Sequence, residues 1–144
     1  PTFIQIPVVG SANCGQATLL AEENIEDYLT VSESLLKKRG NIFALIADGN
    51  SMNAAKVNGT TSIENRDYVV IDGDQRMPNP GDYVLSVIED AANIKKFTRT
   101  KDGNIALVSE STEKFAPIYI SEDDQFMING KVIQVIKAVD GSEE

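Results

Sequence analysis

The stretch DYVLSVIEDAANIKKFTR, residues 82–99, contains two runs rich in β-branched and aromatic residues, 82–89 and 93–99. Such composition between turn residues is typical of strands. Similar runs occur at 41–47, 67–72, 104–109, 117–120 and 126–139, separated by the turn sequences DGD, NPGD, KDGN and EDDQ. The sequence therefore predicts a mainly β domain with strands along most of its length.

The N-terminal third is less regular. An apolar segment, 3–9, is followed by a run of small residues, 10–17, which predicts an exposed loop, and by an acidic segment, 22–27. SESLLKKRG predicts the one short helix, with Ser32 as its N-cap and Gly40 just beyond its end. The stretch 53–65 has neither a helical nor a strand period, and we expect a surface loop there.

The composition excludes several classes of site. The chain of 144 residues has no histidine, which removes Ser-His-Asp triads, Cys-His dyads and histidine-ligated metals. Its single cysteine, Cys14, cannot form an intrachain disulfide. No leader or membrane-length apolar run is present, so we expect a soluble, cytoplasmic domain without membrane contact.

The charge of the domain opposes nucleic-acid binding. A net charge of −9 repels phosphate backbones, so any DNA contact requires a part that this chain lacks. The basic run 37–39 stands at the end of the predicted helix, where cations that complement the helix dipole are the more ordinary explanation.

Two places could supply a nucleophile and a base. Ser51, in DGNSMN, follows a predicted strand at a corner where backbone N–H groups could stabilise an oxyanion, although serine is also ordinary in turns. In NIKKFTR, alternation along a strand places Lys95 on the face of Phe97 and Lys96 on the face of Ile94. Both ammonium groups could extend to water. Alternatively, a lysine desolvated beside Phe97, with a second cation next to it, would lose its proton readily and act as a general base.

Four motifs in order give the chain a wider resemblance: Cys-Gly, then GNSM, then a Gly-Asp-type turn before a strand, then IKKF. From about residue 6 to residue 139 the chain resembles the self-cleaving serine peptidase domains of LexA, the lambdoid phage repressors and UmuD. The closing stretch PIYISEDDQFMINGKVIQVIKAV is similar as well. The resemblance implies a twisted β-sheet peptidase domain with at most one or two short helices.

The resemblance also assigns the site. The Gly-x-Ser-Met motif implies Ser51 as the nucleophile, with Gly49, Asn50 and Met52 supporting its loop, and the lysine motif implies Lys95 as the base. The bond cut in the family lies between a small residue and glycine, and here it maps onto the bond between residues 14 and 15. Cys14, surrounded by small neutral residues, would then supply the attacked carbonyl, and Gly15 the freedom to bend the bond.

The family's biology gives further expectations. The resemblance implies an SOS-regulated transcriptional repressor that cuts its own Cys14–Gly15 bond when the RecA–single-stranded-DNA filament acts as co-protease. It implies a homodimer, no metal or other cofactor, and DNA contact only through a helix-turn-helix domain absent from this chain. We expect an N-terminal segment, 1–17, carrying the cleavage site, and a peptidase and dimerisation domain, 18–144.

Departures from the family keep alternatives open. The loop 53–64 is longer than in LexA or UmuD, and Arg66-Asp67 replaces the usual Gly-Asp pair, which puts the approach of Ser51 to Lys95 in question. A UmuD-type accessory subunit of a translesion DNA polymerase and an inactive dimerisation module are the alternatives. A membrane signal peptidase shares the Ser-Lys chemistry but requires a transmembrane anchor.

Overall fold

The computed structural model describes residues 2–11, 25–37, 40–88, 91–121 and 127–139. Its strands form one nine-stranded sheet in the order β2-β1-β3-β4-β9-β5-β6-β7-β8. This confirms the prediction of a mainly β domain. The strands are β1 (Phe3–Ser11), β2 (Asp27–Ser32), β3 (Ile42–Ile46), β4 (Tyr68–Asp72), β5 (Tyr83–Ile88), β6 (Ala91–Arg99), β7 (Ile105–Val108), β8 (Ile118–Ile120) and β9 (Met127–Ile136).

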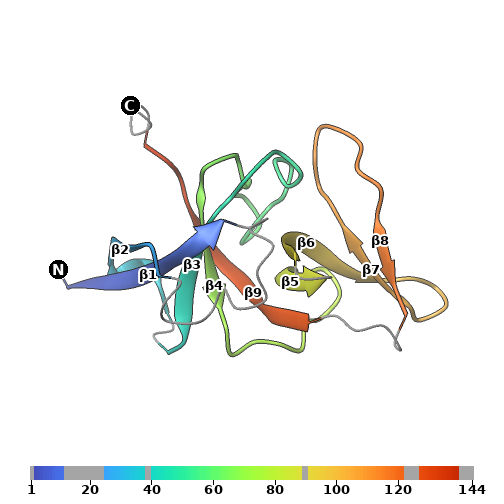
Figure 1. The fold of residues 1–144 in the computed structure, drawn as a ribbon, viewed down its shortest axis with the longest axis horizontal. Coiled ribbons are helices and arrows are strands. Elements are labelled where there is room, and N and C mark those ends of the chain that lie inside the picture. The colour runs from blue at the N-terminus through green and yellow to red at the C-terminus, as the bar shows by residue number, and fades with distance from the viewer. Residues whose placement is uncertain (1, 12–24, 38–39, 89–90, 122–126, 140–144) are drawn as a thin grey trace.

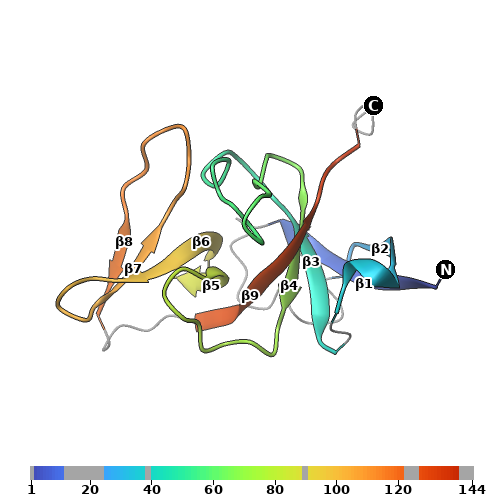
Figure 2. The ribbon, with the colours of Figure 1, turned by 180° about the vertical axis from the view of Figure 1, so that it is seen from behind.

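The sheet twists along the long axis of the molecule, with β1 and β2 near one end and β7 and β8 at the other (Figures 1 and 2). β9 joins the two halves, since it pairs antiparallel with β4 through its later residues and with β5 through its earlier ones. At this junction a Cβ on Gly130 would lie 2.4 Å from the Ile71 side chain and 2.7 Å from the Asp72 carbonyl oxygen. Only glycine fits so close an approach of two strands.

The expected helix is much shorter in the structure. Ser32 caps it as predicted, because its Oγ accepts a hydrogen bond from the Ser34 N–H, but the element is a single 3-10 turn, Glu33–Leu35. Leu36 is already extended and is buried against the sheet, so tertiary packing ends the turn. No helix in the described part of the chain is long and apolar enough to cross a membrane.

Strand β2 was not predicted. It pairs antiparallel with β1 along its whole length and forms the edge of the sheet, with Val31 buried and Tyr28 and Thr30 exposed. An edge strand with one apolar face has a short alternating pattern, and the acidic residues just before it dominate the local composition. The pattern in YLTV, 28–31, was the available evidence for it.

The loop 53–65 is only partly a surface loop, so that prediction is wrong for three of its apolar residues. Ala55, Val57 and Ile63 are 1–2% exposed and belong to the largest core cluster. A turn closed by a bridge between Val57 and Thr61 folds the loop back on the sheet, with Asn58 and Gly59 at positive φ. The three apolar side chains have no regular spacing, because the loop is irregular, and periodicity could not reveal their burial.

Candidate functional site

The corner after β3 presents Ser51. Backbone hydrogen bonds between Ala47 and the segment 66–67 continue the pairing of β3 with β4, after which the chain turns away from the sheet. Gly49 makes this turn at a φ of 94°, a conformation that favours glycine. Its N–H donates to Oδ1 of Asn65 at 2.8 Å, which ties the corner to the end of the loop. The chain just before Ser51 is therefore anchored to the segment 65–67.

Lys95 on β6 reaches this serine. Its Nζ lies 3.2 Å from the Ser51 Oγ, within hydrogen-bond distance. Burial lowers the pKa of Lys95 below the ordinary lysine value, because desolvation disfavours the charged amine. The longer loop 53–64 has thus not separated the two side chains. A neutral amine so close to a hydroxyl can accept its proton.

The neighbouring lysine is in a different state. The Lys96 Nζ donates to Oε2 of Glu110 at 3.0 Å, and this bond raises the pKa of Lys96. Burial is the cause of the lowered pKa of Lys95, and the cation next to it, Lys96, is paired with Glu110. Lys96 stays protonated and is not available as a base.

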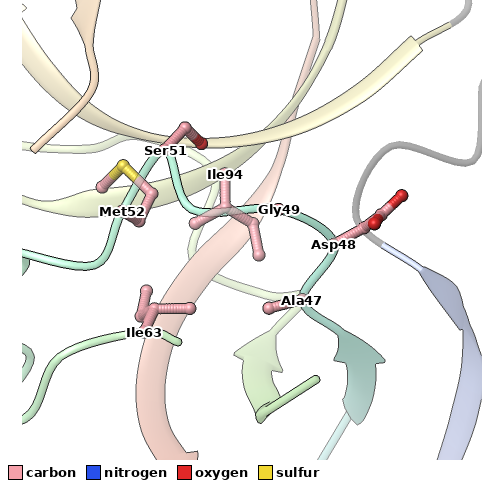
Figure 3. A pocket seen from close by; sticks show the side chains of 7 residues that line it. All are labelled: Ala47, Asp48, Gly49, Ser51, Met52, Ile63 and Ile94. Carbon is pink, nitrogen blue, oxygen red and sulfur yellow. The ribbon is translucent and has the colours of Figure 1, made fainter. Parts of the chain in front are cut away.

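A small pocket opens beside the serine (Figure 3). Figure 3 shows Met52, Ile63, Ala47 and Ile94 around it, while the carboxylate of Asp48 points away. Such a pocket suits a small, uncharged group beside the Ser51 hydroxyl. Ile63 comes from the loop 53–65, so the buried part of that loop shapes the site.

The predicted loop-support residues have structural contacts. The Asn50 carbonyl accepts a hydrogen bond from Ser111 Oγ at 2.8 Å, and its side-chain amide donates to Glu113. Met52 is 4% exposed, and its Sδ accepts a hydrogen bond from the Glu110 N–H at 3.5 Å. Among the described residues, the N–H groups of Ser51 and Met52 have no acceptor, which leaves them able to bind an oxyanion.

Cys14 and Gly15 lie outside the described residues. What the structure describes is the strand before them: β1 runs parallel to β3, and its last residue, Ser11, is paired with Ile46, the last residue of β3. The C-terminal ends of the two strands therefore lie side by side, and the Ser51 corner begins at this end of β3.

Sequence reasoning missed Glu110 and Tyr83, which lie beside the site. Glu110 accepts hydrogen bonds from Lys96 and from the Tyr83 hydroxyl, and the Tyr83 oxygen accepts one from the Lys56 N–H at 2.9 Å. Glu110 belongs to the polar run SESTEK, where solvation is the ordinary expectation for an acidic residue. Only the pairing of distant strands brings it to the serine loop.

Comparison with known proteins supports the same interpretation. The family model described as Peptidase S24-like matches residues 7–133. The chain belongs to this family. It is 36% identical to LexA repressor 1 of Nocardia farcinica over 94% of this chain and 56% of that protein. It is 38% identical to the LexA repressor of Clostridium acetobutylicum over 69% of this chain and 45% of that protein.

The predicted family resemblance is therefore confirmed, and at family level the domain is a serine peptidase of the LexA type. A third relative, the LexA repressor of Alkaliphilus oremlandii, is 36% identical over 94% of this chain and 59% of that protein. The chain spans about half the length of the curated relatives it matches.

Proposed function

We propose that this domain is a Ser-Lys peptidase that hydrolyses its own Cys14–Gly15 bond, as the C-terminal part of an SOS-regulated repressor. The observation that carries the proposal is the 3.2 Å contact between the Ser51 Oγ and the Lys95 Nζ, formed where burial lowers the pKa of the amine. A lysine with an ordinary pKa would be protonated at neutral pH and unable to activate a hydroxyl.

The strand arrangement supports an intramolecular substrate. Cys14 follows Ser11 by three residues, a chain reach of about 10 Å at 3.3 Å per residue. Ser11 pairs with Ile46, and Ser51 follows Ile46 by five residues along the other strand. A bond tethered this close reacts at a high effective concentration, so the fraction of molecules with the segment bound would set the rate. We therefore propose residues 1–17 as the substrate segment and 18–144 as the peptidase and dimerisation domain.

The proposed reaction has two halves. Neutral Lys95 takes the Ser51 proton as Oγ attacks the Cys14 carbonyl carbon, and the Ser51 and Met52 N–H groups stabilise the oxyanion. The ammonium of Lys95 then protonates the Gly15 nitrogen as the peptide bond breaks, leaving Cys14 as an ester on Ser51. Water attacks this ester, Lys95 accepts its proton and returns it to the Ser51 oxygen, and the acid of Cys14 is released. No metal takes part in these steps.

The relatives are named as LexA repressors, which supports the partners that the family resemblance implies. We propose a homodimer, stimulation by the RecA–single-stranded-DNA filament, and DNA binding by a helix-turn-helix domain outside this chain. The net charge of −9 supports the last point, since this domain would repel a phosphate backbone.

Incubation of the chain near pH 10 tests the peptidase proposal, because alkaline pH deprotonates the lysine without any partner. Mass spectrometry should detect fragments 1–14 and 15–144 from the natural chain and only the intact chain from Ser51→Ala. An intact natural chain after long incubation, identical to Ser51→Ala, would reject the proposal.

The bond assignment has its own pair of variants. Cys14→Ala should still cut, since a small side chain remains beside the attacked carbonyl, whereas Gly15→Val should not, since a β-branched residue restricts the backbone. Cleavage at any other bond would show that the assignment of residues 14 and 15 is wrong.

A further inference from the structure

The carboxylate of Glu110 connects the two strands behind the site. Glu110 follows β7 by two residues, its Oε2 accepts from Lys96 on β6, and its Oε1 accepts from the Tyr83 hydroxyl on β5. Burial alone would raise the pKa of Glu110, but the hydrogen bonds from Tyr83 and Lys96 outweigh it and hold the pKa below its ordinary value. The group is therefore a carboxylate at neutral pH, with both oxygens bonded to the sheet.

The backbone of the same residue holds the serine loop. The Glu110 carbonyl accepts the Ala54 N–H at 2.9 Å, and the Glu110 N–H donates to the Met52 Sδ. Met52 and Ala54 lie one and three residues beyond Ser51. The Tyr83 hydroxyl, which donates to Glu110, also accepts the Lys56 N–H. One residue thus joins the loop that carries the nucleophile to the strand that carries Lys95.

The residues after Glu110 extend this contact. Thr112 and Asn53 exchange two hydrogen bonds, of 2.9 and 3.1 Å, and Ser111 donates to the Asn50 carbonyl. The segment 110–113 therefore flanks the loop 50–56 on the side away from β3. Figures 1 and 2 show the chain beyond β7 rising beside the loop that follows β3. Within this segment, Glu110 is the residue whose side chain bonds to β5 and β6.

We propose that Glu110 is a positioning residue, which fixes the Ser51 loop relative to β6 and so sets the Ser51 Oγ against the Lys95 Nζ. It has no contact with the reacting atoms and acts through Lys96, Tyr83 and the loop backbone. The inference rests on the proposed function, since its main effect is on self-cleavage. A misplacement of about 1 Å between a nucleophile and its base can lower a rate by two orders of magnitude.

The test compares pH–rate profiles of self-cleavage for Glu110→Ala, Glu110→Gln, Tyr83→Phe and the natural chain. Loss of positioning should lower the limiting rate at high pH by about 10- to 100-fold in Glu110→Ala. Glu110→Gln should recover most of that loss, because its amide can still accept from Lys96 and bond to Tyr83. Tyr83→Phe should lose less, about threefold. Asp102→Ala, in the exposed turn between β6 and β7, is the matched control for removal of a carboxylate.

The outcomes separate this inference from the proposed function. If the natural chain cuts and Glu110→Ala reaches the limiting rate of Asp102→Ala, the positioning role is wrong while the peptidase stands. A shift in the pH midpoint of the rate profile, with an unchanged limiting rate, would also overturn the positioning role, since Glu110 would then act only through its charge.

A second measurement does not depend on cleavage. Hydrogen exchange at the Ala54 and Lys56 amides, measured in a Ser51→Ala background, should become about tenfold faster with Glu110→Ala and remain unchanged with Asp102→Ala. Unchanged exchange would contradict the inference even if the chain never cuts itself.

Discussion

Lys95 and Lys96 follow one another on β6, yet the pKa values of their side chains are shifted in opposite directions on the two faces of that strand. Lys95 lies opposite Val84, on the face of Phe97, where burial lowers its pKa and its Nζ meets the Ser51 hydroxyl. Lys96 lies opposite Tyr83, where a hydrogen bond from its Nζ to Glu110 raises its pKa. Residue type and sequence neighbourhood are nearly the same, so the environment of each face decides which lysine can be a base.

The difference shows how one fold can lower the pKa of one lysine and keep its neighbour charged. Within the described ranges no carboxylate pairs with Lys95, whereas Glu110 pairs with Lys96. A salt bridge at Lys95 would stabilise its cation and remove the base. The residue whose carboxylate pairs with Lys96 also bonds to the serine loop through its backbone, so charge pairing and loop position are coupled at Glu110.

Replacement of each lysine by alanine should give the largest difference in self-cleavage between the two positions. Lys95→Ala should reduce self-cleavage by about 10³-fold or more, since the general base is lost, whereas Lys96→Ala should reduce it by less than about tenfold. Fragment yield against time at several pH values measures both. Loss of cleavage in Lys96→Ala alone would mean that the roles of the two residues are reversed.

The pH dependence of cleavage should identify the cause of the lysine's basicity. The rate should rise about tenfold per pH unit and level off below the ordinary lysine pKa of about 10.4, because only the neutral amine acts. In Lys96→Met the midpoint should remain below 10.4, since burial lowers the pKa of Lys95. A midpoint that returns to about 10.4 in this variant would assign the effect to the neighbouring charge instead.

The burial of Lys95 should lower the thermal stability of the fold while its amine is charged. Below the pKa of Lys95 the folded state holds a desolvated ammonium, so Lys95→Met should raise the melting temperature by a few degrees at pH 7. Lys96→Met should lower it slightly, because Glu110 loses its partner. Thermal unfolding with a Ser51→Ala background avoids cleavage during the scan. A lower melting temperature for Lys95→Met would show that its amine stabilises the fold.

The lowered pKa of Lys95 also predicts the sign of the pH dependence of stability. The unfolded chain keeps the proton on Lys95 up to about pH 10.4, while the folded chain releases it at lower pH. The free energy of unfolding should therefore rise with pH between the two pKa values. Comparison with Lys95→Met isolates this contribution, and equal slopes for the two proteins in that window would contradict it.

The smallest effect is expected for Lys96→Arg. Arginine retains the positive charge and can still pair with Glu110, so cleavage should change by less than about threefold and stability by less than about 0.5 kcal/mol. A loss of cleavage comparable to that of Lys95→Ala would show that the amine of Lys96, rather than its charge, is required.

Much of this molecule could be predicted from local sequence. Alternating and β-branched runs gave strands β3 to β9, because a half-buried pleated strand imposes a period of two on its side chains. The motifs around Ser51 and Lys95 indicated the two reactive residues. Alternation also placed the two lysines on different faces of one strand, since successive side chains of a strand point oppositely.

Tertiary structure decided what local patterns could not contain. The edge strand β2, the burial of Ala55, Val57 and Ile63, and the single turn of helix at Glu33–Leu35 depend on packing against distant elements. Ser51 and Lys95 are separated by 44 residues along the chain, and their 3.2 Å contact exists only because the sheet brings their elements together. The sequence by itself determined which residues could react. The folded environment determined which amine has a lowered pKa and which is paired, because a pKa depends on desolvation and on partners from other strands.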